Sequence, residues 1–236
     1  MNAFALAIAL AVAAYVPALQ PGDTVPAIPL VDQSGRAFSI AQLRGDVVVL
    51  SFIYTRCADP QMCPLVSSKF ERMQNMLGTA PVRLLEITLD PQFDSPRVLR
   101  AYAHAYGAQP DRWTLATGAP ASIDELAARM GIATQWTRPG TLVHTEAAIV
   151  LDREGRLVQT IDGNAWTPDQ LLASAREAAG AEPSPPLTRV MLWLTAAVES
   201  CGGSRGAVNA WEMLAILLLV IGGIATVLFR AVRSTR

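Results

Sequence analysis

Two patterns of apolar and polar positions divide the middle of the chain into strands and helices. The run 46–54 consists mainly of β-branched, aliphatic and aromatic residues, which is typical of a strand buried on both faces. Shorter apolar runs bounded by Gly, Pro or Asp predict further strands. Segments with helical spacing start at Pro, Ser or Thr, which favour helix N-termini. The predicted strands are 30–38 (a hairpin), 46–54, 82–89, 113–116, 146–151 and 156–161, and the predicted helices are 64–77, 95–106, 122–130 and 167–179.

The order of these elements predicts an α/β domain over residues 22–180. Strands alternate with helices at first, and a hairpin and a last helix follow. This order implies a central mixed sheet flanked by helices on both faces. Residues 181–210, which begin with several prolines and continue into an apolar stretch, are interpreted as a linker and juxtamembrane segment.

The N-terminal segment is apolar but short. A transmembrane helix needs about 20 apolar residues, and the uninterrupted run here ends at residue 14. The small residues Val16 and Ala18 suit cleavage after Ala18, so residues 1–18 are predicted to be a signal peptide. No Lys or Arg precedes Arg36, and an uncleaved, membrane-inserted segment therefore stays open as the alternative.

The C-terminal segment 211–229 has the length and apolar character of a transmembrane helix. The basic tail 230–236 follows at once and is predicted to be cytoplasmic by the positive-inside rule. We therefore expect a single C-terminal span in the lipid bilayer of a bacterial inner (cytoplasmic) membrane. The globular domain is expected on its periplasmic or extracytoplasmic side.

Overall composition narrows the function classes. The formal net charge is -1, which gives no support for nucleic-acid binding. Three cysteines, at 57, 63 and 201, are too few for a disulfide scaffold. The odd count leaves at least one thiol without an internal partner.

Cys57 and Cys63 lie between a buried strand and a helix. Ligand sites of open α/β sheets gather at the carboxyl ends of strands, and a helix N-terminus stabilises negative charge there. Both effects favour the thiolate, which is the reactive and metal-binding form of cysteine. The alternatives without a chemical role are that the two cysteines form a structural disulfide, or that they are simply small buried side chains.

His144 precedes the predicted strand 146–151, where a thioredoxin-like sheet would bring it opposite the cysteine loop. Two thiolates and one imidazole form a soft ligand set that suits Cu(I) and that can also hold Cu(II). Zinc accepts the same donors, with water as a fourth ligand, and spacing alone does not exclude it.

Several stretches together resemble the Sco/SenC family of copper chaperones, which serve assembly of the copper centre of cytochrome c oxidase. They are 51–57, 63–65, 88–96, 106–113, 117–118 and 143–144. The resemblance implies a thioredoxin-like fold, copper as the metal, and a copper-binding subunit of a terminal oxidase as the partner. It places the metal ligands at Cys57, Cys63 and His144, and it places Asp90 where it helps to shape the site.

The chain departs from this family in two respects. The usual motif has three residues between the cysteines, whereas five separate Cys57 from Cys63, with Pro60 available to turn the longer loop. The predicted anchor is C-terminal, whereas an N-terminal anchor is common in the family.

The leading functional hypothesis is a membrane-anchored metallochaperone, which is not an enzyme in the strict sense. The alternative is a thiol–disulfide reductase that keeps the partner's copper-ligand cysteines reduced and that needs Cys57 and Cys63 but not His144. A thiol peroxidase, with Arg56 activating one cysteine, is a third reading. No site role is expected for His104, for Cys201 or for Asp94, which is assigned to the turn before a helix.

Overall fold

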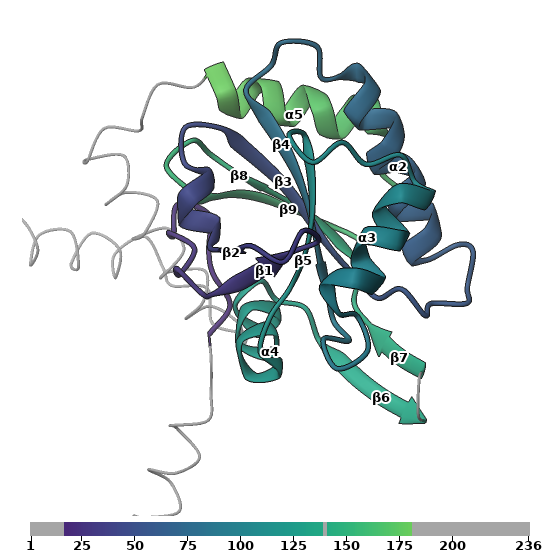
Figure 1. Ribbon diagram of the computed structural model, residues 1–236. Helices are drawn as coiled ribbons and strands as arrows, with labels where there is room; N and C mark the ends of the chain where they lie inside the picture. Colours follow the sequence, from purple (N-terminus) through teal and green to yellow (C-terminus); the bar gives the residue numbers. More distant parts are fainter. Residues whose placement is uncertain (1–16, 139–140, 181–236) are drawn as a thin grey trace, which may run out of the picture. The chain divides into compact units, whose positions relative to one another are not determined.

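The computed structural model describes residues 17–138 and 141–180 (Figure 1). The predicted linker 181–210, span 211–229 and tail 230–236 lie outside this part of the chain, as does nearly all of the predicted signal peptide. No helix among the described residues is long and apolar enough to cross a membrane. The N–H of Leu19 donates to the carbonyl of Arg129 (2.7 Å), so the segment before residue 22 also contacts the domain.

A seven-stranded mixed sheet forms the centre of the molecule, in the order β2-β1-β5-β4-β3-β8-β9. The inner strands β3, β4 and β5 are parallel, and the outer neighbours β1, β2, β8 and β9 pair antiparallel. The strands are β1 (Leu30–Asp32), β2 (Ala37–Phe38), β3 (Val47–Ile53), β4 (Val82–Thr88), β5 (Trp113–Thr117), β8 (Ala147–Leu151) and β9 (Leu157–Asp162). The inner strands are buried on both faces, as the continuous apolar run predicted.

Helices cover both faces of this sheet, as predicted (Figure 1). They are η1 (Ile40–Leu43), α2 (Cys63–Met76), α3 (Pro96–Ala105), α4 (Pro120–Arg129) and α5 (Pro168–Gly180). Ser67 of α2 bonds Glu86 of β4 and Tyr102 of α3, which places α2 and α3 on one face. Each of these α-helices starts within a residue or two of a proline, which fits the first helical turn because that turn needs no N–H partner.

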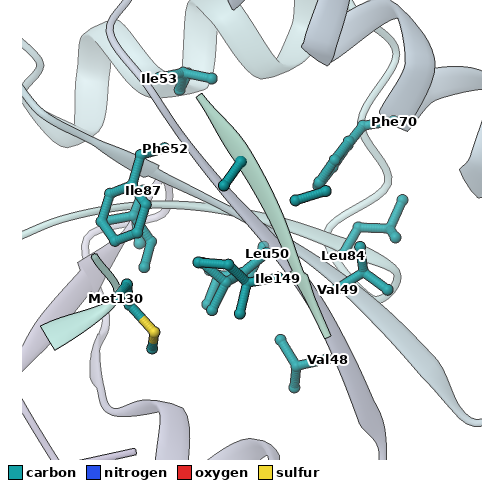
Figure 2. Packing of buried hydrophobic residues seen from close by; sticks show 14 of the residues in the cluster. Val48, Val49, Leu50, Phe52, Ile53, Phe70, Leu84, Ile87, Met130 and Ile149 are labelled. Carbon is teal, nitrogen blue, oxygen red and sulfur yellow. The ribbon is translucent and has the colours of Figure 1, made fainter. Parts of the chain in front are cut away.

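The core has two sides because side chains alternate along the strands. Figure 2 shows Phe52, Ile87 and Met130 on one side of the central strands and Phe70 on the other. Trp113 is fully buried, and its ring centroid lies 5.9 Å from that of Phe70. This core holds β3 rigidly, and β3 leads directly into the cysteine loop.

A second, two-stranded sheet was not predicted. β6 (Thr134–Arg138) and β7 (Thr141–His144) pair antiparallel and hydrogen-bond to no strand of the large sheet. The segment assigned to a loop before 146–151 is therefore partly a strand that ends at His144. Trp136 and Val143 of this hairpin are 49% and 54% exposed, so one face of the hairpin lies in solvent.

Candidate metal and thiol site

The two cysteines come from the ends of adjoining elements. Cys57 lies in the loop after β3 and is half-buried, whereas Cys63 is the first residue of α2 and is 1% exposed. Pro64 follows in the first turn of α2. The sequence therefore positions Cys63 at a helix N-terminus, where the orphan N–H groups favour negative charge.

The two thiols interact and titrate very differently. The hydrogen bond from the Cys63 side chain is the main reason that the pKa of Cys57 falls to about 5. The same bond, with burial, raises the pKa of Cys63 well above its ordinary value. Both cysteines are free thiols. In neutral solution Cys57 is therefore the thiolate, and Cys63 is its proton-bearing partner.

His144 approaches Cys63 from the opposite side of the site. Its Nε2 lies 3.7 Å from the Cys63 sulfur, and its Nδ1 lies 3.0 Å from the carbonyl oxygen of Thr145. In the neutral ring, the Nδ1–H donates a hydrogen bond to this carbonyl. The unprotonated Nε2 therefore directs its lone pair toward the Cys63 thiol. Burial lowers the pKa of His144, which favours this neutral form. Tyr54 meets the ring edge-on, with 6.1 Å between the ring centroids.

The loop between the cysteines has its own internal turn. The Asp59 carboxylate accepts the N–H of Gln61 (2.9 Å), and the Asp59 carbonyl accepts the N–H of Met62 (3.1 Å). From the far side, the Asn164 amide donates to the Gln61 carbonyl (2.6 Å). The five-residue spacing is thus accommodated by an Asx turn at Asp59 and by a bond to the segment before α5.

Asp94 anchors the start of the cysteine loop. Its side chain is fully buried and accepts hydrogen bonds from the backbone N–H of Thr55 (3.0 Å) and from the hydroxyls of Thr55 and Thr88. Asp94 does lie in the turn before α3, as expected, but its anchoring role was not predicted from the sequence. The acid fixes the point at which β3 becomes the loop.

Asp90 acts on the loop through Arg56. One carboxylate oxygen of Asp90 accepts a hydrogen bond from Nε of Arg56 (3.0 Å) and forms an ion pair with a terminal nitrogen of the same guanidinium. The guanidinium also lies 4.2 Å from the ring centre of Phe93. Asp90 is 3% exposed. It therefore holds the residue before Cys57 and is not seen in contact with the thiols. A cavity of about 590 Å³ adjoins this pair and is also lined by Trp136.

A buried carboxyl group behind Cys63 was missed in the sequence. Glu86 on β4 is fully buried, and the hydroxyl of Ser67 donates to it (2.8 Å). Burial raises the pKa of Glu86 to about 8, and its charge contributes to the raised pKa of Cys63. A lone acid at an inward position of an apolar strand run was the available signal.

The structure thus brings Cys57, Cys63 and His144 together. Asp90 contacts Arg56, the residue before Cys57, rather than the thiols. Within residues 17–138 and 141–180, no three side chains of His, Cys, Asp and Glu stand in a group with the spacing of a metal site. The arrangement contains one thiolate, one thiol and one oriented imidazole. Such a set can exchange thiols and can offer soft ligands to a metal.

The family model of SCO1/SenC matches residues 17–180. The chain belongs to the SCO1/SenC family. The SCO1 protein homologue of Bacillus subtilis is 25% identical over 153 residues, which cover 62% of this chain and 78% of that protein. The SCO2-like protein RT0576 of Rickettsia typhi is 33% identical over 78 residues, or 32% of this chain and 37% of that protein.

Solved SCO1/SenC structures share the fold. BsSco, described as a member of the Sco family of cytochrome c oxidase assembly proteins with a disulfide switch, superposes with a TM-score of 0.60. It is 23% identical over 70% of this chain and 99% of that chain. Copper-bound yeast Sco1 superposes with the same TM-score of 0.60. It is 22% identical, and the match covers 76% of this chain and 99% of that chain. The predicted α/β, thioredoxin-like fold is confirmed for the described residues.

Proposed function

We propose that the chain is a membrane-anchored copper metallochaperone that delivers copper to the copper-binding subunit of a terminal oxidase. Membership of the SCO1/SenC family supports this function, because solved relatives include copper-bound and oxidase-assembly proteins. The C-terminal segment 211–229 is the proposed anchor, with the domain outside the cytoplasm. A SCO1/SenC lipoprotein among the structural neighbours is consistent with a membrane-attached domain.

The observation that carries the proposal is the pairing of His144 with Cys63. In zinc sites, metal–sulfur and metal–nitrogen bonds are about 2.3 and about 2.0 Å, and two such ligands at a trigonal angle stand about 3.7 Å apart. The Nε2–sulfur distance is 3.7 Å. The lone pair of Nε2 faces the sulfur because the proton is on Nδ1, which donates a hydrogen bond to the Thr145 carbonyl.

Copper is the cargo in this proposal, and Cys57, Cys63 and His144 are its ligands. Two sulfurs and one imidazole suit Cu(I) and accept Cu(II). Cys57 is already a thiolate, whereas Cys63 must lose its proton on binding. Cys57 also lies in the loop and is the more exposed of the two, so it is the ligand that can open the site to a recipient.

A second function is favoured by the thiol pair itself. A low-pKa Cys57 beside a protonated Cys63 is the arrangement of a dithiol reductant. The Cys57 thiolate would attack a partner disulfide, and Cys63 would then displace the partner. Two electrons and the proton of Cys63 pass to the partner, which takes a second proton from solvent and leaves with two thiols, and Cys57 and Cys63 become a disulfide. His144 has no necessary part in these steps.

The test is a copper titration of the reduced full-length protein in detergent, with Cys201→Ser in every variant. His144→Ala should weaken Cu(I) and Cu(II) binding at least about tenfold, since a three-coordinate site loses one of three ligands. The matched control is His104→Ala, because His104 is the only other histidine of the chain and is exposed on α3. Unchanged copper binding by His144→Ala, with disulfide exchange intact, would make the reductase the better account.

A further inference from the structure

Glu146 shares a cavity with His144 but has no role in the ligand set above. It lies two residues after His144, in the short link between β7 and β8. A cavity of about 610 Å³ is lined by both residues and by Met62, which directly precedes Cys63. Oε1 of Glu146 is buried and has no hydrogen-bond partner in the described part of the chain. A buried carboxylate oxygen without a partner is costly unless a ligand or cation serves it.

The charges around Glu146 are mostly negative. Burial and the charges of Cys57 and Asp59 raise the pKa of Glu146, whereas Lys69 and a hydrogen bond to the Asn164 side chain lower it. The ammonium of Lys69 is already engaged: it donates to the carbonyls of Asn164 and Trp166 and lies 4.8 Å from the ring centre of Trp166. Asp162 lines the same cavity. The surroundings of Glu146, next to His144, therefore carry negative charge that a bound cation would balance.

We propose that Glu146 makes the copper site favour Cu(II) over Cu(I). This inference rests on the proposed function, since it concerns copper held at Cys57, Cys63 and His144. A fixed negative charge stabilises a divalent ion about twice as strongly as a monovalent ion at the same place. A carboxylate is also a hard oxygen donor, whereas the thiolates suit the soft Cu(I) ion. Glu146 thus sets the relative affinity for the two oxidation states.

The experiment compares copper affinities of the full-length protein in detergent, with Cys201→Ser in every variant. Cu(I) is titrated without oxygen against a chromophoric Cu(I) chelator, and Cu(II) is titrated against a Cu(II) chelator. Glu146→Gln keeps the shape of the side chain and removes its charge. We expect the Cu(II) affinity of this variant to fall at least about tenfold more than its Cu(I) affinity.

Two variants serve as comparisons. Glu146→Asp keeps the charge and should retain most of the Cu(II) preference. Glu154→Gln removes a charge from the turn at the other end of β8 and should leave both affinities unchanged. The electron paramagnetic resonance spectrum of bound Cu(II) gives an independent readout, which Glu146→Gln should alter and Glu154→Gln should not.

The outcomes separate this inference from the proposed function. Equal losses of Cu(I) and Cu(II) affinity in Glu146→Gln, or no loss of either, overturn the role of Glu146 while copper binding itself stands. If Glu146→Gln does not fold, an unchanged Cu(II) to Cu(I) ratio and unchanged spectrum in Glu146→Lys or Glu146→Thr overturn it equally. Copper binding that is unaffected by His144→Ala overturns the proposed ligand set, and this inference with it.

Discussion

The site joins two regions that are built in opposite ways. The cysteine side grows out of the most buried part of the molecule: β3 is buried along its whole length, and Asp94 and Asp90 hold the first residues of the loop. The histidine side ends a hairpin that forms its own two-stranded sheet and carries exposed Trp136 and Val143. At its base, the hairpin is closed by bonds between Ala133 and Thr145.

The two sides of the site therefore differ in how firmly their surroundings hold the side chains in place. A side chain fixed by a packed core and by buried hydrogen bonds has one low-energy position. The outer face of the hairpin, with Trp136 and Val143, can adjust at little cost because few buried contacts oppose the motion, although Leu142 and His144 on its inner face are buried. We expect variants on the cysteine side to change stability and thiol chemistry strongly. Variants on the exposed face of the hairpin should have little effect on folding.

Among variants at the site, the largest stability effect is expected for Asp94→Ala. Three donors, the N–H and hydroxyl of Thr55 and the hydroxyl of Thr88, lose their acceptor in a buried place. Each unsatisfied group costs about 1–3 kcal/mol, so the free energy of unfolding should fall by about 4 kcal/mol. Urea denaturation of a fragment spanning 17–180 measures the change. Asp94→Asn, which retains one acceptor oxygen, should lose less, and a loss below about 1 kcal/mol for Asp94→Ala would contradict the anchoring role.

Glu86→Gln should increase stability in a pH-dependent way. The pKa of Glu86 is about 8 in the folded protein and has an ordinary value of 4.5, so its pKa is raised by folding. Between these values the unfolded chain releases the proton while the folded protein keeps it, and stability falls as pH rises. Each pH unit is worth about 1.4 kcal/mol.

The gain in Glu86→Gln should therefore be roughly 4 kcal/mol near pH 7.5 and should vanish near pH 4. The amide can still accept the bond from Ser67. Urea denaturation at the two pH values checks the prediction. A gain that is the same at both would show that packing, rather than the proton, causes it.

Alkylation should distinguish the two thiols. With a pKa of about 5, Cys57 is already a thiolate at pH 6, so its rate with iodoacetamide should be close to its plateau there. We expect it to react at least about tenfold faster at pH 6 than an ordinary thiol, while Cys63 stays slow. Mass spectrometry of the reduced fragment identifies the site. Cys63→Ala removes the hydrogen bond and should move the plateau to higher pH; a Cys57 rate that climbs steadily to pH 9 in the unsubstituted fragment would refute the assignment.

The smallest stability effect is expected on the histidine side. Trp136→Ala removes a side chain that is 49% exposed and should change the free energy of unfolding by less than about 1 kcal/mol. The matched control is Trp166→Ala, because Trp166 is 5% exposed and packs on Phe70, and it should cost about 3–5 kcal/mol. Equal costs for the two variants would show that the hairpin is part of the core after all.

The sequence predicted the parts of the fold that have a local signal. Residues 46–54 were predicted as a strand buried on both faces and 82–89 as a strand, and both are buried in the structure. Helix α2 was expected from the proline after Cys63. The hairpin β6–β7 was missed because its residues are mixed polar and apolar, with one face in solvent. The Pro139–Gly140 dipeptide between two runs rich in β-branched residues was a usable turn signal.

The candidate site was predictable only as far as its residue types. Cys57 and Cys63 stood out because they lie where a buried strand leads into a helix, and His144 stood out because it precedes a predicted strand opposite the cysteine loop. Asp94 and Glu86 did not, because their partners come from Thr55, Ser67 and other positions far away in sequence. The role of a buried acid depends on the residues that surround it in space. The pattern of apolar and polar positions along the chain does not reveal which residues those are.

The placement of the tryptophans gives the protein separate optical reporters. Within the described residues, Trp113 and Trp166 are buried in the core, whereas Trp136 is 49% exposed and lines the same cavity as Arg56. In a 17–180 fragment the two remaining tryptophans, at 193 and 211, are absent. Fluorescence from Trp113 and Trp166 would then follow unfolding, while quenching of Trp136 by iodide would follow events at the rim of the site. A single Trp136→Phe substitution separates the two signals without a label.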